Sequence, residues 1–168
     1  MSTARSESLS PLAGLEAAQE QRTRALLKST PTLGESIRST VLPFTLDPLK
    51  GSLSPDAAKT LAALEKQAAS IAIRSLISLA KANDIDHLGG GLELIPALLM
   101  TLASIDYDKR HFAIEHGHAS IGYYAALAAL GFLPEERVIE SFRRSLDMAG
   151  HVSWVAGGTP IGSGRLGV

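Results

Sequence analysis

The sequence predicts a helix-rich α/β fold, and two patterns carry this prediction. Across residues 54–83, apolar side chains recur every three or four positions, which is the period of an amphipathic helix. Residues 112–114 (Phe-Ala-Ile) form a short apolar run with strand character, and an Ala-rich segment typical of a helix begins at Ala119. We therefore expect a strand-to-helix junction at residues 115–118, where the positive end of a helix dipole favours a polar or anionic ligand.

The composition is that of one globular domain. The chain has 168 residues, of which 45% are apolar, enough to bury a single core. Sixteen basic and seventeen acidic residues leave a formal charge of −1 without a basic stripe, so we expect no nucleic-acid partner. Cysteine is absent, which excludes disulfides and thiol nucleophiles and fits a reducing compartment.

Two further absences predict the location of the protein. The first thirty residues contain no continuous apolar core with a cleavage site, as a secretion signal would. The longest apolar stretches are too short, or too interrupted by charged residues, to span a bilayer. We expect a soluble, cytoplasmic protein without a membrane partner.

Residues 1–53 are predicted to form an N-terminal arm and connector, and residues 54–168 a single domain. Residues 1–10 are polar and rich in Ser, as in an arm that orders only against a partner. Residues 11–28 have the composition of a short surface helix. Residues 29–52 accumulate Pro and Gly between apolar residues, which is the pattern of an extended connector lying on another surface.

The long helix after this connector begins with a cap. Ser54 can accept a hydrogen bond from the backbone, Pro55 is tolerated in a first helical turn, and Asp56 favours the positive end of the dipole. The apolar face of the helix is marked by six residues: Leu61, Leu64, Ala68, Ile71, Ser75 and Leu79. This helix should therefore be a main element of the core.

A second helix is predicted at residues 92–105. It follows a polar turn, residues 83–91, that ends in three consecutive glycines, and these allow the backbone to approach another segment closely. Pro96 falls in or near the first turn of the helix, where its missing N–H is tolerated.

Two more helices are predicted in the second half of the chain. The one from Ala119 stops at Gly131, a typical C-terminal glycine, and Pro134 restarts a helix that runs to about Leu146. Residues 147–168 hold six of the fifteen glycines and lack an amphipathic period. We expect another polypeptide to cover this glycine-rich end.

Five histidines fall between positions 87 and 151, and three of them are candidate functional residues. His87, His118 and His151 each stand near Gly in an irregular stretch, where a side chain can project from closely approaching backbone. His111 and His116 are interpreted as ordinary surface or hydrogen-bonded core histidines.

A zinc site is a competing interpretation of the histidines around position 117. His116 and His118 are two positions apart, whereas ligands on one helix are spaced by three or four, and Glu115 is the only supporting carboxylate. We therefore predict no metal ligands in this chain.

Four short motifs follow one another along the chain: Asp-His-Leu-Gly-Gly at 86–90, Glu-His-Gly-His-Ala-Ser at 115–120, Ala-Gly-His at 149–151 and Gly-Thr-Pro-Ile-Gly-Ser-Gly at 158–164. In order and spacing they resemble the N-terminal half of transketolase-like thiamine-diphosphate enzymes, the superfamily of transketolase and homodimeric pyruvate dehydrogenase. The resemblance covers about residues 55–168. It implies an incomplete thiamine-diphosphate-binding domain, a parallel sheet with flanking helices that lacks its C-terminal portion.

The resemblance also implies catalytic roles for three histidines. His87 would reach the substrate and the reaction centre, and His118 would face the cofactor's diphosphate and the substrate pocket. His151 would contact substrate oxygens or help to shuttle protons. Histidine suits these roles because it titrates near neutrality and can hydrogen-bond an alkoxide oxygen.

The glycine-rich motif would bind the cofactor's pyrimidine ring through its backbone. The resemblance assigns this contact to Thr159 and Ile161, with Gly162 permitting the close approach. The family's Gln in this motif is replaced by Ser163.

Other departures from the family pattern also bear on substrate contacts. Leu88 and Val152 stand where the family usually has Pro, and His116 stands where it has Asn or Lys.

One family signature is missing from the 168 residues. No Gly-Asp-Gly segment followed by Asn occurs, and in the family this segment binds Mg²⁺ and the cofactor's diphosphate. The glutamate that activates the cofactor comes from another domain of these enzymes. The resemblance thus implies one subunit of a split transferase, which binds thiamine diphosphate and Mg²⁺ jointly with a complementary subunit that carries both features.

The implied reaction is two-carbon ketol or acyl transfer, or decarboxylation of a 2-oxo acid. The substrate would be a small keto sugar or a 2-oxo acid. Three alternatives stay open at this point: a non-catalytic structural or regulatory subunit that retains the fold, a gene fragment without function, and an unrelated α/β domain.

Overall fold

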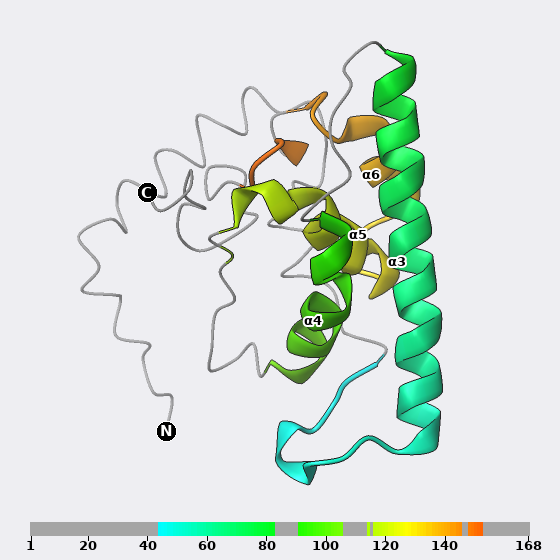
Figure 1. The fold of residues 1–168 in the computed structure, drawn as a ribbon, viewed down its shortest axis with the longest axis vertical. Coiled ribbons are helices and arrows are strands. Elements are labelled where there is room, and N and C mark those ends of the chain that lie inside the picture. The colour runs from blue at the N-terminus through cyan, green and yellow to red at the C-terminus, as the bar shows by residue number, and fades with distance from the viewer. Residues whose placement is uncertain (1–43, 83–90, 106–113, 115, 146–147, 153–168) are drawn as a thin grey trace, which may run out of the picture.

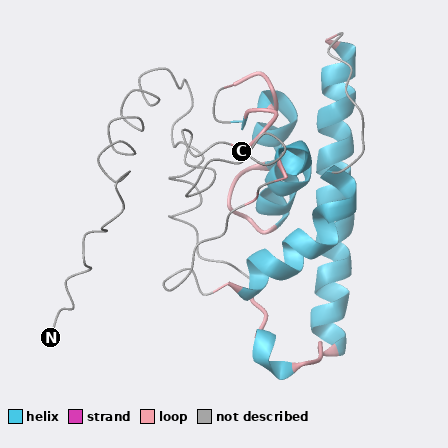
Figure 2. Ribbon diagram, turned by 60° about the vertical axis from the view of Figure 1, so that its left-hand side comes forward, coloured by secondary structure: helices cyan, strands magenta, loops and turns pink. Residues whose placement is uncertain are grey.

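The computed structural model describes the chain in five ranges, residues 44–82, 91–105, 114, 116–145 and 148–152, and these are mainly helical (Figures 1 and 2). The helices are α3 (Pro55–Lys81), α4 (Gly91–Ser104), α5 (Ser120–Ala129) and α6 (Glu135–Ser141), with two 3-10 turns, η1 (Pro48–Lys50) and η2 (Gly117–Ala119). Helix α5 packs against α3, α4 and α6 and is the centre of the arrangement.

The predicted α/β fold with a parallel sheet is wrong, because the described part of the chain contains helices and no strand. Phe112 and Ala113 of the predicted strand lie outside the described residues, and Ile114 belongs to no helix or strand. Ile114 is instead buried in a core formed by the helices. A run of three apolar residues indicates that the segment is buried, but it does not distinguish a strand from a buried loop.

Helix α3 forms as predicted, with the predicted start. The backbone N–H of Ala57 donates to Ser54 Oγ at 3.2 Å, Pro55 occupies the first turn, and Asp56 lies at the positive end of the dipole. Four of the six residues predicted for the apolar face are buried, and Leu61 and Leu64 pack against the core at its edge.

Helix α4 is also confirmed, within one residue at each end of the prediction. Pro96 is its sixth residue, so it lies in the second turn and not the first. Pro96 is exposed, and its ring therefore displaces no core side chain. The buried residues of α4 are Gly91, Ile95, Leu98, Leu99, Leu102 and Ala103.

Helix α5 ends at the predicted glycine. Gly131 adopts a left-handed φ of 87° and its N–H donates to the carbonyl of Ala128 at 2.9 Å. The N–H of Phe132 donates to the carbonyl of Leu127, also at 2.9 Å. This pair of bonds is the Schellman motif, which satisfies the last carbonyls of a helix.

Helix α6 restarts after Pro134 as predicted, but it ends at Ser141, well before the predicted end near Leu146. Phe142 leaves the helical conformation with ψ of 123° and buries its ring in the core. Arg143 follows with a left-handed φ of 58°. The burial of Phe142, which no Gly or Pro signals in the sequence, therefore accompanies the early end of the helix.

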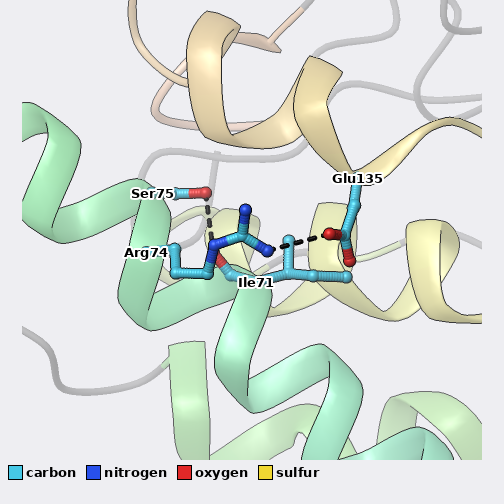
Figure 3. A network of polar contacts seen from close by, with 4 residues as sticks. All are labelled: Ile71, Arg74, Ser75 and Glu135. Carbon is cyan, nitrogen blue, oxygen red and sulfur yellow. Dashed lines mark hydrogen bonds and ion pairs between the residues drawn. The ribbon is translucent and has the colours of Figure 1, made fainter.

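Helices α3 and α6 are joined by an ion pair on the surface (Figure 3). Arg74 Nη1 lies 2.8 Å from Glu135 Oε1, and both side chains are partly exposed. Next to Arg74, the buried hydroxyl of Ser75 donates to the carbonyl of Ile71 at 2.8 Å, which satisfies it within its own helix.

The first described residues of the predicted connector, 44–46, pack against the helices, and residues 47–53 are exposed. Phe44 and Leu46 are partly buried against the core, and the Leu46 N–H donates to the carbonyl of Ala103 in α4 at 2.8 Å. The rest of the predicted arm, residues 1–43, lies outside the described residues. None of the helices described is both long enough and apolar enough to cross a membrane.

Candidate functional site

The predicted junction is a 3-10 turn that leads directly into α5. His116 stands at the N-cap of η2, and the N–H of Ala119 donates back to its carbonyl at 2.9 Å. Ser120 then begins α5, and all ten residues of that helix are buried. His118 therefore lies on a tight turn at the N-terminal end of a helix that is fixed in the core.

His118 and His151 meet at this end of α5. Their ring centroids lie 4.9 Å apart and the ring planes are tilted by 57°. His118 is exposed and His151 is half-buried. The fold thus brings together two of the three histidines that the motifs identify, at one accessible position on the surface.

The segment that carries His151, residues 148–152, is held at both of its ends. The carbonyl of Met148 accepts a hydrogen bond from the N–H of Arg143 at 2.7 Å, across the left-handed turn that follows α6. Val152, directly after His151, is buried with 1% of its surface exposed. The chain on both sides of His151 is therefore anchored.

Two hydroxyls of α5 hold the middle of the same segment. The Tyr124 hydroxyl donates to the carbonyl of Ala149 at 3.0 Å. The Ser120 hydroxyl donates to the carbonyl of Gly150, thirty positions away in the sequence. Helix α5 thus binds the backbone immediately before His151.

The start of α4 contacts the start of α5 through two glycines. A Cβ atom added to Gly122 would lie 2.0 Å from the carbonyl oxygen of Gly91, and one added to Gly91 would lie 2.4 Å from Cγ2 of Ile121. Real Cβ atoms do not approach other atoms so closely. The close approach predicted from the three consecutive glycines is confirmed for Gly91.

Four predicted site residues lie outside the described residues, namely His87, Thr159, Ile161 and Gly162. The remaining two, His118 and His151, are the ones that the structure brings together.

The described residues offer no metal centre. No three His, Cys, Asp or Glu side chains among them lie close enough to hold one ion. His116 is exposed at the cap of η2, whereas the ring contact with His151 is made by His118.

Sequence reasoning missed Ser120 and Tyr124. Both have 1% of their surface exposed, and both stand on a helix whose other residues, apart from Tyr123, carry no polar side-chain group. A buried hydroxyl requires a hydrogen-bond partner, and positions four apart lie on the same face of a helix. That spacing was the available signal, although it could not indicate which carbonyls the hydroxyls bind.

Two adjacent imidazoles form a versatile polar site. Neutral imidazole has one N–H donor and one nitrogen acceptor, and it gains a second donor on protonation. Two such rings at one accessible position can bind neighbouring oxygens of a carbonyl compound, or move a proton to and from one of them.

Comparison with models of protein families, with curated proteins and with solved structures found no match to this chain.

Proposed function

We propose that this chain is one component of a thiamine-diphosphate-dependent transferase and that His118 and His151 face the substrate of that enzyme. The observation that supports the proposal is the ring contact of 4.9 Å between these residues. The two residues belong to two separate motifs, and the resemblance places each of them at the substrate or the cofactor. An accessible histidine pair is what these two motifs require.

The proposal concerns a helical part of the enzyme. The turn η2, which lies directly before α5, supplies His118, and the segment 148–152 supplies His151. The cofactor, when bound, supplies the carbon nucleophile that adds to a carbonyl group. His118 and His151 hydrogen-bond the oxygens of the bound substrate and carry a proton to or from the oxygen that changes charge.

The side chains of His118 and His151 are suited to contacting the substrate of such an enzyme and not to binding its Mg²⁺. The imidazoles are donors and acceptors suited to hydroxyl, carbonyl and phosphate oxygens. Mg²⁺ requires oxygen ligands in octahedral geometry, and the described residues hold no group of three candidate ligands. We therefore assign Mg²⁺ and the activating glutamate to a complementary subunit that contains a Gly-Asp-Gly segment followed by Asn.

The substrate class follows from the reaction class. Two-carbon ketol or acyl transfer uses a small keto sugar, and decarboxylation uses a 2-oxo acid. Both compounds place a carbonyl oxygen next to another oxygen, which two neighbouring imidazoles can bind together. The assembly is proposed to act in the cytoplasm.

The test is reconstitution with the proteins encoded beside this one. The chain is co-expressed with the neighbour that contains the Gly-Asp-Gly to Asn segment, and turnover of a ketose phosphate and of a short 2-oxo acid is measured with thiamine diphosphate and Mg²⁺. We expect His118→Ala and His151→Ala each to lower kcat by about 100-fold or more, as loss of a proton-transfer group does. The control is His116→Ala, which should leave kcat unchanged.

Two results would contradict the proposal. Full activity of the neighbouring proteins without this chain would exclude it from the enzyme. Unchanged turnover of a complex that contains either alanine variant would indicate a structural or regulatory subunit instead.

A further inference from the structure

We propose that Ser120 and Tyr124 are positioning residues that set the contact between His151 and His118. The inference rests on the proposed function for its effect on turnover, but the contact itself can be measured without any activity.

The geometry begins with three consecutive carbonyls before His151. The first, of Met148, is bound by a backbone N–H at 2.7 Å. The second and third, of Ala149 and Gly150, are bound by side-chain hydroxyls of α5. A loop backbone with every carbonyl engaged in this way has little freedom to move the side chain that follows it.

The two hydroxyls come from one face of one helix. Ser120 and Tyr124 are one turn apart, so they point to the same side of α5. The Tyr124 ring is fixed as well, since it packs edge-on against Phe142 with centroids 6.1 Å apart. Both donors are therefore rigid, and their positions determine where the carbonyls of Ala149 and Gly150 lie.

The other half of the pair lies directly before α5. His118 stands two residues before Ser120, in the turn that leads into the helix. The position of His118 and the position of the carbonyl before His151 are thus both set by the first residues of α5. One rigid element fixes both rings, which is the kind of support that a site needs to hold its reacting groups in place.

Neither hydroxyl is placed to touch a substrate. Each residue has only 1% of its surface exposed, and each hydroxyl donates its proton to a backbone carbonyl. Their role is to orient His151, and they are not catalytic residues.

If the two hydroxyls only stabilised the fold, their removal would leave the contact between His118 and His151 unchanged in the folded protein. Ser75 provides the matched control for the loss of a buried hydroxyl. Its hydroxyl is also buried and also donates to a backbone carbonyl, that of Ile71, but within α3. Ser75→Ala removes the same chemical group as Ser120→Ala and leaves the segment 148–152 untouched.

The test uses the full chain with isotopically labelled histidine. The nuclear Overhauser effect between ring protons of His118 and His151 reports their contact. We expect it in the unsubstituted protein and in Ser75→Ala, and we expect it to be lost in Ser120→Ala combined with Tyr124→Phe. Each single substitution should weaken it, and Ser120→Thr, which keeps the hydroxyl, should restore it relative to Ser120→Ala.

In the reconstituted complex, the double variant should lower kcat by about 100-fold while KM changes little, because displacement of a catalytic group by about 1 Å has that effect. If the alanine substitution prevents folding, Tyr124→Phe alone carries the test, since it keeps the packed ring. An Overhauser effect of unchanged strength in a folded Tyr124→Phe variant, or one that persists in a folded double variant, overturns the positioning role. An effect that is lost while kcat stays unchanged supports the positioning role and contradicts the proposed function instead.

Discussion

Helices α3 and α5 lie against each other, but they are buried to very different extents. Helix α3 has 27 residues, and six of them are buried along one stripe. Helix α5 has ten residues, and all ten are buried. The first is a surface helix with one apolar face, and the second is a core helix packed against three others.

The difference shows why the candidate site is built around α5. A helix that is buried on every side cannot shift without disturbing its neighbours, because protein cores are close-packed. Groups attached to its first turn share that rigidity. Helix α3, in contrast, packs against the core through one long apolar stripe only. Its outer face carries exposed residues such as Ile73 and Ile77.

The largest effect tests the buried stripe of α3. Ile71 is fully buried, so Ile71→Ala should lower the free energy of unfolding by about 4 kcal/mol through lost burial and a cavity. Ile73 is 41% exposed, and Ile73→Ala should change it by about 0.5 kcal/mol or less. Urea denaturation of both variants measures the difference. Equal losses would show that the outer face of α3 is covered as well.

The next effect tests the close packing of α5. Gly122→Ala should cost about 3 kcal/mol, because the new Cβ would meet the backbone of Gly91, which cannot move aside as a flexible side chain can. Higher helix propensity of Ala offsets only about 1 kcal/mol of the clash.

Gly150→Ala is the matched control for this glycine. Its Cβ would meet the flexible side chain of Arg143 at 3.3 Å, so the loss should be about 1 kcal/mol or less. Thermal unfolding of the two variants measures which of them loses more stability. If Gly122→Ala were no worse than the control, the crossing of α4 and α5 would be looser than the structure shows.

A smaller effect tests the cap of α3, which is local in sequence. Ser54→Ala removes the acceptor for the N–H of Ala57 and should cost about 1 kcal/mol. Ser70, exposed in the middle of α3, serves as the control, because Ser70→Ala removes a hydroxyl without removing a cap. Urea denaturation should show a loss for the first variant alone, and the cap assignment fails if both behave alike.

The smallest effect tests the surface link between α3 and α6. A double-mutant cycle with Arg74→Gln and Glu135→Gln should give a coupling energy of about 0.5 kcal/mol, because the pair is partly exposed and screened by solvent. Raising the salt concentration should reduce this coupling. A coupling that is large and independent of salt would mean that the pair is buried by something else in solution.

Of the six site residues that the sequence predicts, the fold brings His118 and His151 together, and the functional roles of both stay predictions. The contact itself could not be predicted, because nothing local relates two residues so far apart in the chain. Ser120 and Tyr124 were missed for the same reason, since each bonds a carbonyl 25 or 30 positions away. The roles that the resemblance implies for His87, Thr159, Ile161 and Gly162 stay predictions.

The sequence by itself determined the helices whose signals are local. The Ser-Pro-Asp cap of α3, its apolar period, and the glycine that ends α5 act within a few residues, so they could be recognised without the fold. Only the tertiary structure decided that Ile114 lies in a helical core and not in a sheet, and that Phe142 turns inward and accompanies the early end of α6. Burial depends on which surfaces meet, and that is a property of the whole packed chain.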